Sequence, residues 1–180
     1  MDTSACIVVG TDGTPSAATA VRYALGEGVR RGLPVRVVAA VTAPDYWTEA
    51  LAGARNFPPL PDLRPIARET AQAQVAAAVA AEPALAAADA TVVVVDVAAG
   101  PLGQALVDVA DGAELLVLGH RGRGALSSAL LGSVGLYCLV HARCPVTIVP
   151  PEWTPAPTSA QQAAQTSAQT SAQPPAGATT

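Results

Sequence analysis

Short runs of apolar, largely β-branched residues alternate with longer amphipathic segments over the first 150 residues of the chain. The apolar runs predict buried β-strands, at residues 5–10, 35–41, 91–97, 115–119 and 146–149. The segments between them carry apolar residues at helical spacing and predict helices, at residues 15–31, 66–82, 102–110 and 133–141. Regular alternation of strand and helix is typical of an open parallel sheet with right-handed crossovers and helices on both faces. We therefore expect one α/β domain, residues 1–150.

The ends of the first helix carry clear local signals. Thr14 and Pro15 are typical of an N-cap residue and of the first helical position, and Gly32 is typical of a residue that ends a helix. The third strand carries a different signal. Residues 91–97 form a continuous run rich in valine, which predicts a strand covered on both faces.

Two segments depart from the alternating pattern. Residues 42–65 contain five prolines, and a connection of this length is often a lid or a binding loop. A surface excursion with locally packed aromatic side chains is the alternative. Residues 151–180 are rich in Pro, Ser, Thr, Gln and Ala, which predicts a disordered tail. We expect Trp153 to pin the start of this tail to the domain.

Composition and charge exclude several classes of function. The formal net charge of -4 argues against a general nucleic-acid binder, which needs a basic face. All ten basic residues are arginine, and the absence of lysine excludes a Walker A loop and Schiff-base chemistry. With no long apolar run and no signal-peptide pattern, the protein is predicted to be cytoplasmic. Cys6, Cys138 and Cys144 form no CxxC pair, so we expect structural thiols.

The carboxyl ends of the first and fourth strands carry the candidate binding chemistry. The segments are Gly10-Thr11-Asp12-Gly13-Thr14, Gly119-His120-Arg121-Gly122 and, at the start of the next helix, Gly132-Ser133-Val134. Open parallel sheets bind ligands at such strand ends. Glycine lets the backbone approach a ligand, and a helix N-terminus can receive a phosphate. If the two strands are neighbours, Asp12 faces the glycine loop. Asp12 is otherwise explained as a turn residue that accepts hydrogen bonds from its own loop.

The glycine spacing points to a particular kind of ligand. Gly119, Gly122, Gly132 and Ser133 fit the spacing G-x2-G-x9-G-[ST], and in this motif the chain resembles the ATP-binding branch of the universal stress protein family. Residues 8–16 and 141–146 resemble the family as well, and the resemblance covers about residues 4–150. It implies an open Rossmann-like sheet of order 3-2-1-4-5, similar to the adenine nucleotide alpha hydrolases. The implied ligand is ATP, or AMP/ADP, bound with Mg²⁺.

The same resemblance assigns roles to individual positions. Asp12 would lie beside the adenosine or its metal-bound phosphates, and Ala40 or its neighbour at the end of the second strand would flank the adenine. Leu118 and Gly119 would line the ribose side. The residues around the phosphates would be Gly122, Gly132, Ser133 and Val134. Arg121 could reach the phosphates as a charge-assisted donor, with a solvated loop charge as the alternative.

One position departs from the family pattern. Members that bind ATP often carry Ser or Thr after the residue that matches Val134, whereas this chain has Gly135. The loss of one hydroxyl costs about 1 kcal/mol net, and glycine is unfavourable in the first turn of a helix. We therefore expect weaker phosphate binding, with the site retained.

The expected function is that of a stress-response sensor or regulator that binds ATP. No residues form a convincing nucleophile and base, so hydrolysis is expected to be slow at most. The resemblance implies a homodimer through the apolar sheet edge at Val146, Thr147, Ile148 and Val149. An edge protected by its flanking prolines is the alternative.

Two other functions stay open. The first is a dimeric interaction module of the same family that binds no nucleotide, for which Gly135 leaves room. The second is an enzyme of the ATP-pyrophosphatase type. Such an enzyme carries a serine and paired glycines after its first strand, which residues 10–14 lack.

Overall fold

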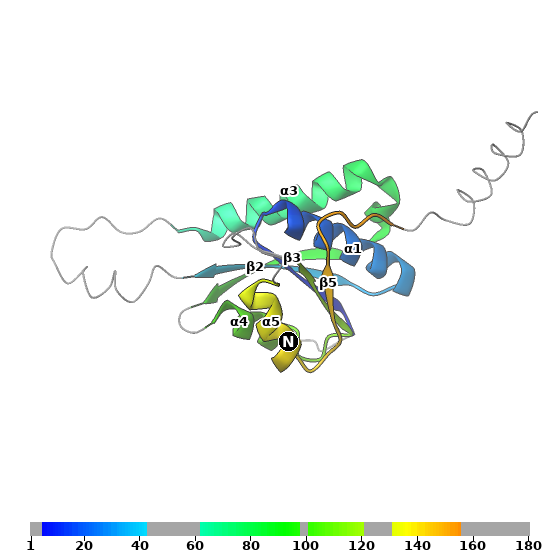
Figure 1. Ribbon diagram of the computed structural model, residues 1–180. Helices are drawn as coiled ribbons and strands as arrows, with labels where there is room; N and C mark the ends of the chain where they lie inside the picture. Colours follow the sequence, from blue (N-terminus) through cyan, green and yellow to red (C-terminus); the bar gives the residue numbers. More distant parts are fainter. Residues whose placement is uncertain (1–4, 43–61, 98–100, 121–130, 156–180) are drawn as a thin grey trace, which may run out of the picture.

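A five-stranded, all-parallel sheet forms the centre of the molecule (Figure 1). The computed structural model describes residues 5–42, 62–97, 101–120 and 131–155. The strands are β1 (Ile7–Thr11), β2 (Val35–Thr42), β3 (Ala90–Val97), β4 (Leu115–Gly119) and β5 (Val146–Val149). Their order in the sheet is β3-β2-β1-β4-β5. Both the α/β fold class and the strand order expected from the sequence are confirmed.

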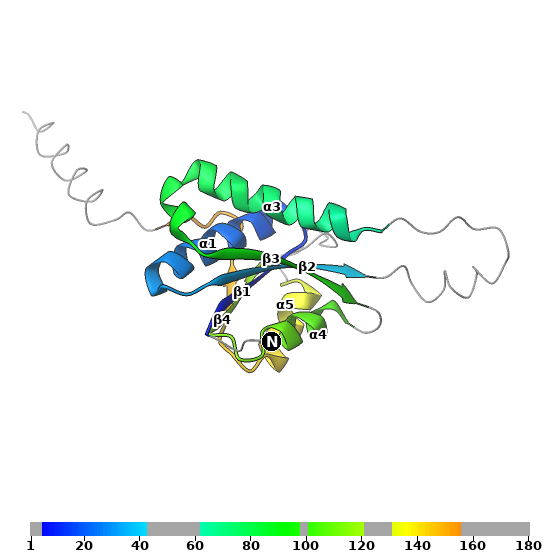
Figure 2. The same cartoon turned by 180° about the vertical axis from the view of Figure 1, so that it is seen from behind.

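The helices form two layers, one on each face of the sheet, as Figures 1 and 2 show from opposite sides. In the described parts of the chain the helices are α1 (Pro15–Arg31), α3 (Arg64–Ala81), α4 (Leu102–Val109) and α5 (Ser133–His141), with a short 3-10 helix, η1 (Pro83–Ala87), after α3. α1 and α3 cover one face, and α4 and α5 cover the other. The four α-helices match those expected from the sequence, and η1 was not expected.

The central strand β1 contributes to both apolar cores. Ile7 and Val9 pack in the core under α1 and α3, whereas Val8 packs in the core under α4 and α5. All three side chains are fully buried. Successive side chains of a strand point to opposite faces, so a run of consecutive apolar residues is what a doubly covered strand requires.

The ends of α1 agree with the sequence signals. The Thr14 hydroxyl accepts a hydrogen bond from the backbone N–H of Ala17 at 3.3 Å, and Pro15 occupies the first helical position. At the other end, Gly32 caps the helix in the left-handed conformation, with φ of 65°. A side chain is unfavourable in that conformation, which explains why glycine ends the helix there.

The expectation that residues 91–97 are covered on both faces is confirmed in part: Val92 and Val94 pack against the core under α1 and α3, and Val95 packs against the core under α4 and α5, but the cover is incomplete. β3 is an edge strand, and Thr91 and Asp96 are exposed while most of its other side chains are only partly buried. A continuous β-branched run does not distinguish an edge strand from a central one, because the difference depends on which strands pair with it.

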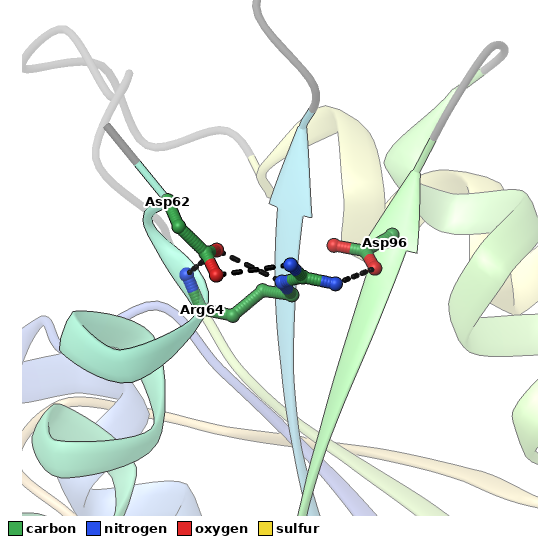
Figure 3. Close-up of polar contacts among 3 residues, drawn as sticks. All are labelled: Asp62, Arg64 and Asp96. Carbon is green, nitrogen blue, oxygen red and sulfur yellow. Dashed lines mark hydrogen bonds and ion pairs between the residues drawn. The ribbon is translucent and has the colours of Figure 1, made fainter. Parts of the chain in front are cut away.

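An exposed group of three charges joins α3 to the end of β3 (Figure 3). The Arg64 guanidinium contacts both carboxylate oxygens of Asp62, at 2.8 and 2.9 Å, and one oxygen of Asp96 at 3.5 Å. Asp62 also accepts a hydrogen bond from the backbone N–H of Arg64 at 3.0 Å. The group therefore holds the first turn of α3 at the carboxyl edge of the sheet.

Trp153 packs on the outer side of α1, as the sequence analysis expected. Its ring meets Tyr23 edge to face, with the ring centroids 5.0 Å apart, and the Arg22 guanidinium lies 5.3 Å from the ring centroid. Arg22 also donates a hydrogen bond to the Trp153 carbonyl oxygen at 2.8 Å. The chain just beyond β5 is thus attached to the domain. The expected tail from residue 156 onward and the proline-rich segment 43–61 lie outside the described residues.

The cysteines lie in or against the core under α4 and α5. Cys6 and Cys138 are buried, Cys144 is half-buried, and all three are free thiols. Burial, aided by the nearby Cys144, raises the pKa of the Cys138 thiol to about 11. A thiol that stays protonated is a poor nucleophile, which supports the structural role expected from the sequence.

Within the described ranges, no helix has both the length and the apolar character that crossing a membrane requires.

Candidate functional site

A pocket of about 610 Å³ opens at the carboxyl edge of the sheet. Its walls come from the ends of β1, β2 and β4, the starts of α1, α3 and α5, and one side of α4. β1 pairs with β2 on one side and with β4 on the other, so successive crossovers diverge at this point of the sheet. Open parallel sheets bind ligands at such a switch point, and the volume is typical of a small-molecule site.

The fold brings most of the residues proposed from the sequence to this one pocket. The lining includes Asp12, Ala40, Leu118, Gly119, Gly132, Ser133 and Val134. The other two proposed residues, Arg121 and Gly122, lie outside the described residues. These seven residues belong to four separate segments of the chain, which meet because parallel strands end at the same edge of the sheet.

Asp12 follows β1 and lines the pocket from a turn that its own side chain stabilises. Its Oδ1 accepts hydrogen bonds from the backbone N–H of Thr14 at 3.0 Å and from the Thr14 hydroxyl at 2.7 Å. Gly13, with φ of 84°, provides the positive φ of this turn. Asp12 therefore does act as a turn residue that accepts hydrogen bonds from its own loop. These hydrogen bonds also fix the orientation of its carboxylate, which lines the pocket.

Gln74 of α3 holds the same loop from the helix side. Its Oε1 accepts a hydrogen bond from the Thr11 hydroxyl, and its Nε2 donates one to the Thr14 carbonyl oxygen at 3.1 Å. The sequence does not single out Gln74, which stands among alanines, with one other glutamine at Gln72, in a segment whose composition indicates only a helix. Its partners are 63 and 60 residues away along the chain.

The start of α5 brings backbone N–H groups to the pocket. Gly132 is the N-cap residue, and its extended backbone has φ of -61° and ψ of 151°. Gly132 N–H donates to the His120 carbonyl oxygen at 3.3 Å, and His120 N–H donates to the Val149 carbonyl oxygen at 2.9 Å. The first turn of a helix has N–H groups without partners inside the helix and carries partial positive charge. The ends of β4 and β5 thus hold a potential anion site in place.

The opposite wall of the pocket, next to the end of β2, is apolar. Leu63, the N-cap residue of α3, and Ile66 in its first turn line it, although 41% and 58% of their surfaces are exposed. Ala40 and Val41 line it from β2. Large apolar side chains that stay exposed beside a pocket are typical of a ligand-binding surface. The pocket therefore combines an apolar end with an end suited to an anion.

Gly135 lies within the first turn of α5, buried at the edge of the pocket. A Cβ placed at this position would lie 3.2 Å from Leu131 Cδ1 and 3.6 Å from Ile148 Cδ1. Both atoms are ends of side chains and not backbone atoms, so a small side chain could be accommodated here if Leu131 shifts slightly. The absence of a side chain at Gly135 therefore has a packing explanation in addition to its effect on a bound phosphate.

Ionisable chemistry in the pocket is sparse. Asp12 supplies the single ionisable side chain among the described residues that line it. Over the described ranges, no group of three or more His, Cys, Asp or Glu side chains is arranged to hold a metal ion. The described lining is therefore suited to binding and offers no general base paired with a nucleophile.

The model of the universal stress protein family matches residues 6–150. The chain belongs to the universal stress protein family. A curated relative in the family, universal stress protein Rv1996 of Mycobacterium tuberculosis strain H37Rv, is 34% identical over 160 residues. The match covers 83% of this chain and 49% of the relative, so the chain spans about half the length of the curated relatives it matches most fully.

Solved structures of the family share the fold. A universal stress protein crystallised in complex with cAMP is 26% identical, with a TM-score of 0.56, over 81% of this chain and 96% of that one. The universal stress protein of Archaeoglobus fulgidus in complex with dAMP is 21% identical, with a TM-score of 0.50, over 80% of this chain and 96% of that one. The second likeness concerns the fold alone.

Proposed function

We propose that this universal stress protein binds an adenine nucleotide, ATP or AMP/ADP, in the pocket at the carboxyl ends of β1, β2 and β4. The observation that carries the proposal is the meeting of the Asp12 loop, the apolar wall beside β2 and the start of α5 around one cavity of about 610 Å³. The complex of a 26% identical family member with cAMP supports the same class of ligand.

The two ends of the pocket suggest how the nucleotide would lie. The adenine would pack beside Ala40, against Leu63 and Ile66, because its flat apolar faces suit that wall. The ribose would follow past Leu118 and Gly119 at the end of β4. This orientation directs the phosphates away from the apolar wall and toward α5.

The phosphates would bind at the start of α5. The backbone N–H groups of Ser133 and Val134 and the exposed Ser133 hydroxyl are donors of the kind that bind phosphate at helix N-termini. Gly132, whose own N–H donates to the His120 carbonyl oxygen, precedes them as the N-cap residue beside the phosphates. Arg121 and Gly122, from the segment outside the described residues, complete the proposed set. A Mg²⁺ ion carried by the phosphates would lie beside the Asp12 carboxylate, since carboxylate and phosphate oxygens are its preferred ligands.

We assign the protein a sensing or regulatory role in the stress response, with the occupied pocket as its signal. The described lining pairs no base with a nucleophile, which supports slow hydrolysis at most. The proposal places the protein in the cytoplasm, the compartment that holds the pool of adenine nucleotides.

We also infer that two copies associate through β5. β5 is an edge strand, and Val146, Thr147 and Ile148 on it are only partly buried. The neighbouring helix α5 exposes Leu136, Leu139 and Val140, with 57%, 47% and 70% of their surfaces accessible. An unpaired strand edge next to an apolar helix surface favours pairing with another chain.

Thermal unfolding in the presence of ligand tests the nucleotide proposal. A ligand that binds only the native state stabilises it by about 2.7 kcal/mol at a hundred times its Kd. We expect ATP with Mg²⁺, AMP or cAMP at millimolar concentration to raise the Tm, and GTP to raise it less. No shift with any adenine nucleotide would refute the proposal and favour the nucleotide-independent interaction module.

A pair of variants on α3 locates the binding. Thr70 lines the pocket, whereas its neighbour Glu69 is exposed and does not. Thr70→Trp should fill the pocket and abolish the ligand-induced shift. Glu69→Trp, which adds the same side chain outside the pocket, should retain the shift. Equal behaviour of the two variants would place the ligand elsewhere.

A further inference from the structure

Gln74 connects the wall of the pocket with the loop that carries Asp12. α3 supplies Thr70 and Ala71 to the pocket lining, and Gln74 follows on the same helix. Its side-chain amide reaches two points of the β1–α1 loop, the hydroxyl of Thr11 and the carbonyl oxygen of Thr14. These two residues stand on either side of Asp12.

The chemistry of the partners fixes the orientation of the Gln74 amide. The Thr14 carbonyl oxygen can only accept a hydrogen bond, so the amide NH₂ group must face it, at 3.1 Å. The amide oxygen then faces Thr11, whose hydroxyl donates to it and accepts a hydrogen bond from Gly13 N–H at 3.3 Å. A rotated amide would place its oxygen against the Thr14 carbonyl oxygen, where neither atom can donate, so the contact with Thr14 selects the orientation shown.

The same contacts determine where the Asp12 carboxylate lies. Its Oδ1 is held by the N–H and the hydroxyl of Thr14, at 3.0 and 2.7 Å. Thr14 in turn is held through its carbonyl oxygen by Gln74 and by the first hydrogen bond of α1, from Ala18 N–H at 2.9 Å. Thr11 is buried, with 8% of its surface exposed, so its hydroxyl depends on a protein partner.

We propose that Gln74 is a positioning residue for nucleotide binding, which acts by fixing the Asp12 loop relative to the α3 wall of the pocket. The inference rests on the proposed function. A nucleotide that fills the pocket touches the wall and the loop together, so its affinity depends on the distance between them. The hydrogen bonds of Gln74 join the two, and Gln74 lies outside the G-x2-G-x9-G-[ST] motif.

A double-mutant cycle with AMP as the probe tests the inference. Gln74→Met keeps the length of the side chain and removes both hydrogen bonds. We expect it to weaken AMP binding about ten-fold, the change that results when the freed loop occupies its binding-competent position about a tenth of the time. In an Asp12→Ala background the same substitution should change the Kd less than two-fold, because the group that Gln74 positions is then absent. Equal effects in both backgrounds would overturn the inference.

Two controls separate this inference from the proposed function. Gln72→Met makes the same substitution at an exposed position of α3 and should leave the Kd unchanged. Amide hydrogen exchange of Gly13 and Thr14 needs no ligand, and Gln74→Met should accelerate it relative to Gln72→Met. Unchanged exchange would refute the positioning role even if the protein binds no nucleotide. Normal binding of AMP by Gln74→Met would refute it while the proposed function stands.

Discussion

The backbone carbonyl oxygen of Ser16 lies 2.7 Å from the point where any side chain at Gly119 would place its Cβ. The Ser16 hydroxyl oxygen is 2.8 Å from the same point. The end of β4 therefore touches the first turn of α1 directly. The sequence predicts that Gly119 lets the backbone approach a ligand. The structure shows a second reason for glycine at this position, because the Ser16 backbone already occupies the space that a side chain would need.

Gly119→Ala should destabilise the fold. The atoms that the new methyl group would meet belong mainly to backbone, which cannot rotate away, and overpacking of this kind costs about 1–3 kcal/mol. Gly26→Ala is a matched control, because a Cβ there would meet Arg30 Nη1 at an ordinary 3.5 Å inside α1. Removing a glycine from a helix interior should stabilise by about 0.5–1 kcal/mol. Urea unfolding of both variants measures the two effects, and effects of the same sign would contradict this account of Gly119.

Gly135→Ser should strengthen the binding of a nucleotide that carries phosphates. The serine would restore the hydroxyl that ATP-binding relatives often have, worth about 1 kcal/mol or roughly five-fold in Kd. Its Cβ would lie 3.2 Å from Leu131 Cδ1, so this half-buried leucine must shift by a few tenths of an ångström. Gly135→Ala makes the same demand on Leu131 without the hydroxyl. Titration calorimetry should show that Gly135→Ser binds ATP more tightly than Gly135→Ala does, whereas the two variants should bind adenosine with the same Kd. Equal Kd values for the two variants with ATP would refute a role of the hydroxyl.

The boundaries of several elements could be predicted closely from the sequence. The expected bounds of β4, α5 and β5 coincide with the observed ones. Pro145 and Pro150 bracket β5, and residues 133–141 have a helical pattern after Gly132, so local signals decide these ends. The strand order is a different case. It came from the family resemblance, because periodicity does not tell which strands are neighbours.

The features that could not be predicted depend on distant partners. The exposure of Thr91 and Asp96 follows from the position of β3 at the sheet edge. η1 is one short turn of mostly alanine after Pro83, too brief to show a period. The contacts of Gln74 join residues 60 or more positions apart. In each case the local sequence is compatible with several arrangements, and tertiary packing selects one.

Glu27 should make the stability of the fold depend on pH in the acid range. Burial of this carboxyl acts to raise its pKa, but hydrogen bonds and charges from Arg30 and Arg31 outweigh burial and hold the pKa below the ordinary value of 4.5. The folded state therefore binds the proton less well than the unfolded state does. The stabilisation from Glu27 is fully present above pH 4.5 and is lost as the pH falls through the lowered pKa.

Glu27→Gln isolates this contribution. The variant should be less stable than the natural protein at pH 7, by about 1–3 kcal/mol for hydrogen bonds to a charged group. The difference should begin to shrink below pH 4.5, where the unfolded state takes up the proton, and should stop changing once the pH is below the lowered pKa of the folded state. Urea unfolding at several pH values measures it, with Glu69→Gln, on the exposed side of α3, as the control. A difference that stays constant down to pH 3 would contradict the assigned role of the charge.

A charge on the β5 edge should separate the proposed dimer. Thr147 lies in the middle of the strand and is half-buried, and Val140 on α5 has 70% of its surface exposed. In a two-fold interface one substitution appears in both copies, so Thr147→Lys or Val140→Arg would place like charges in the same interface. Like charges so placed cost several kcal/mol, and we expect the dissociation constant to rise at least a hundred-fold.

Gln72→Arg, on the opposite layer of the molecule, should leave association unchanged. Sedimentation equilibrium measures the association. Two outcomes would show that β5 is not the interface: a natural protein that is monomeric at high micromolar concentration, or charged variants that still dimerise.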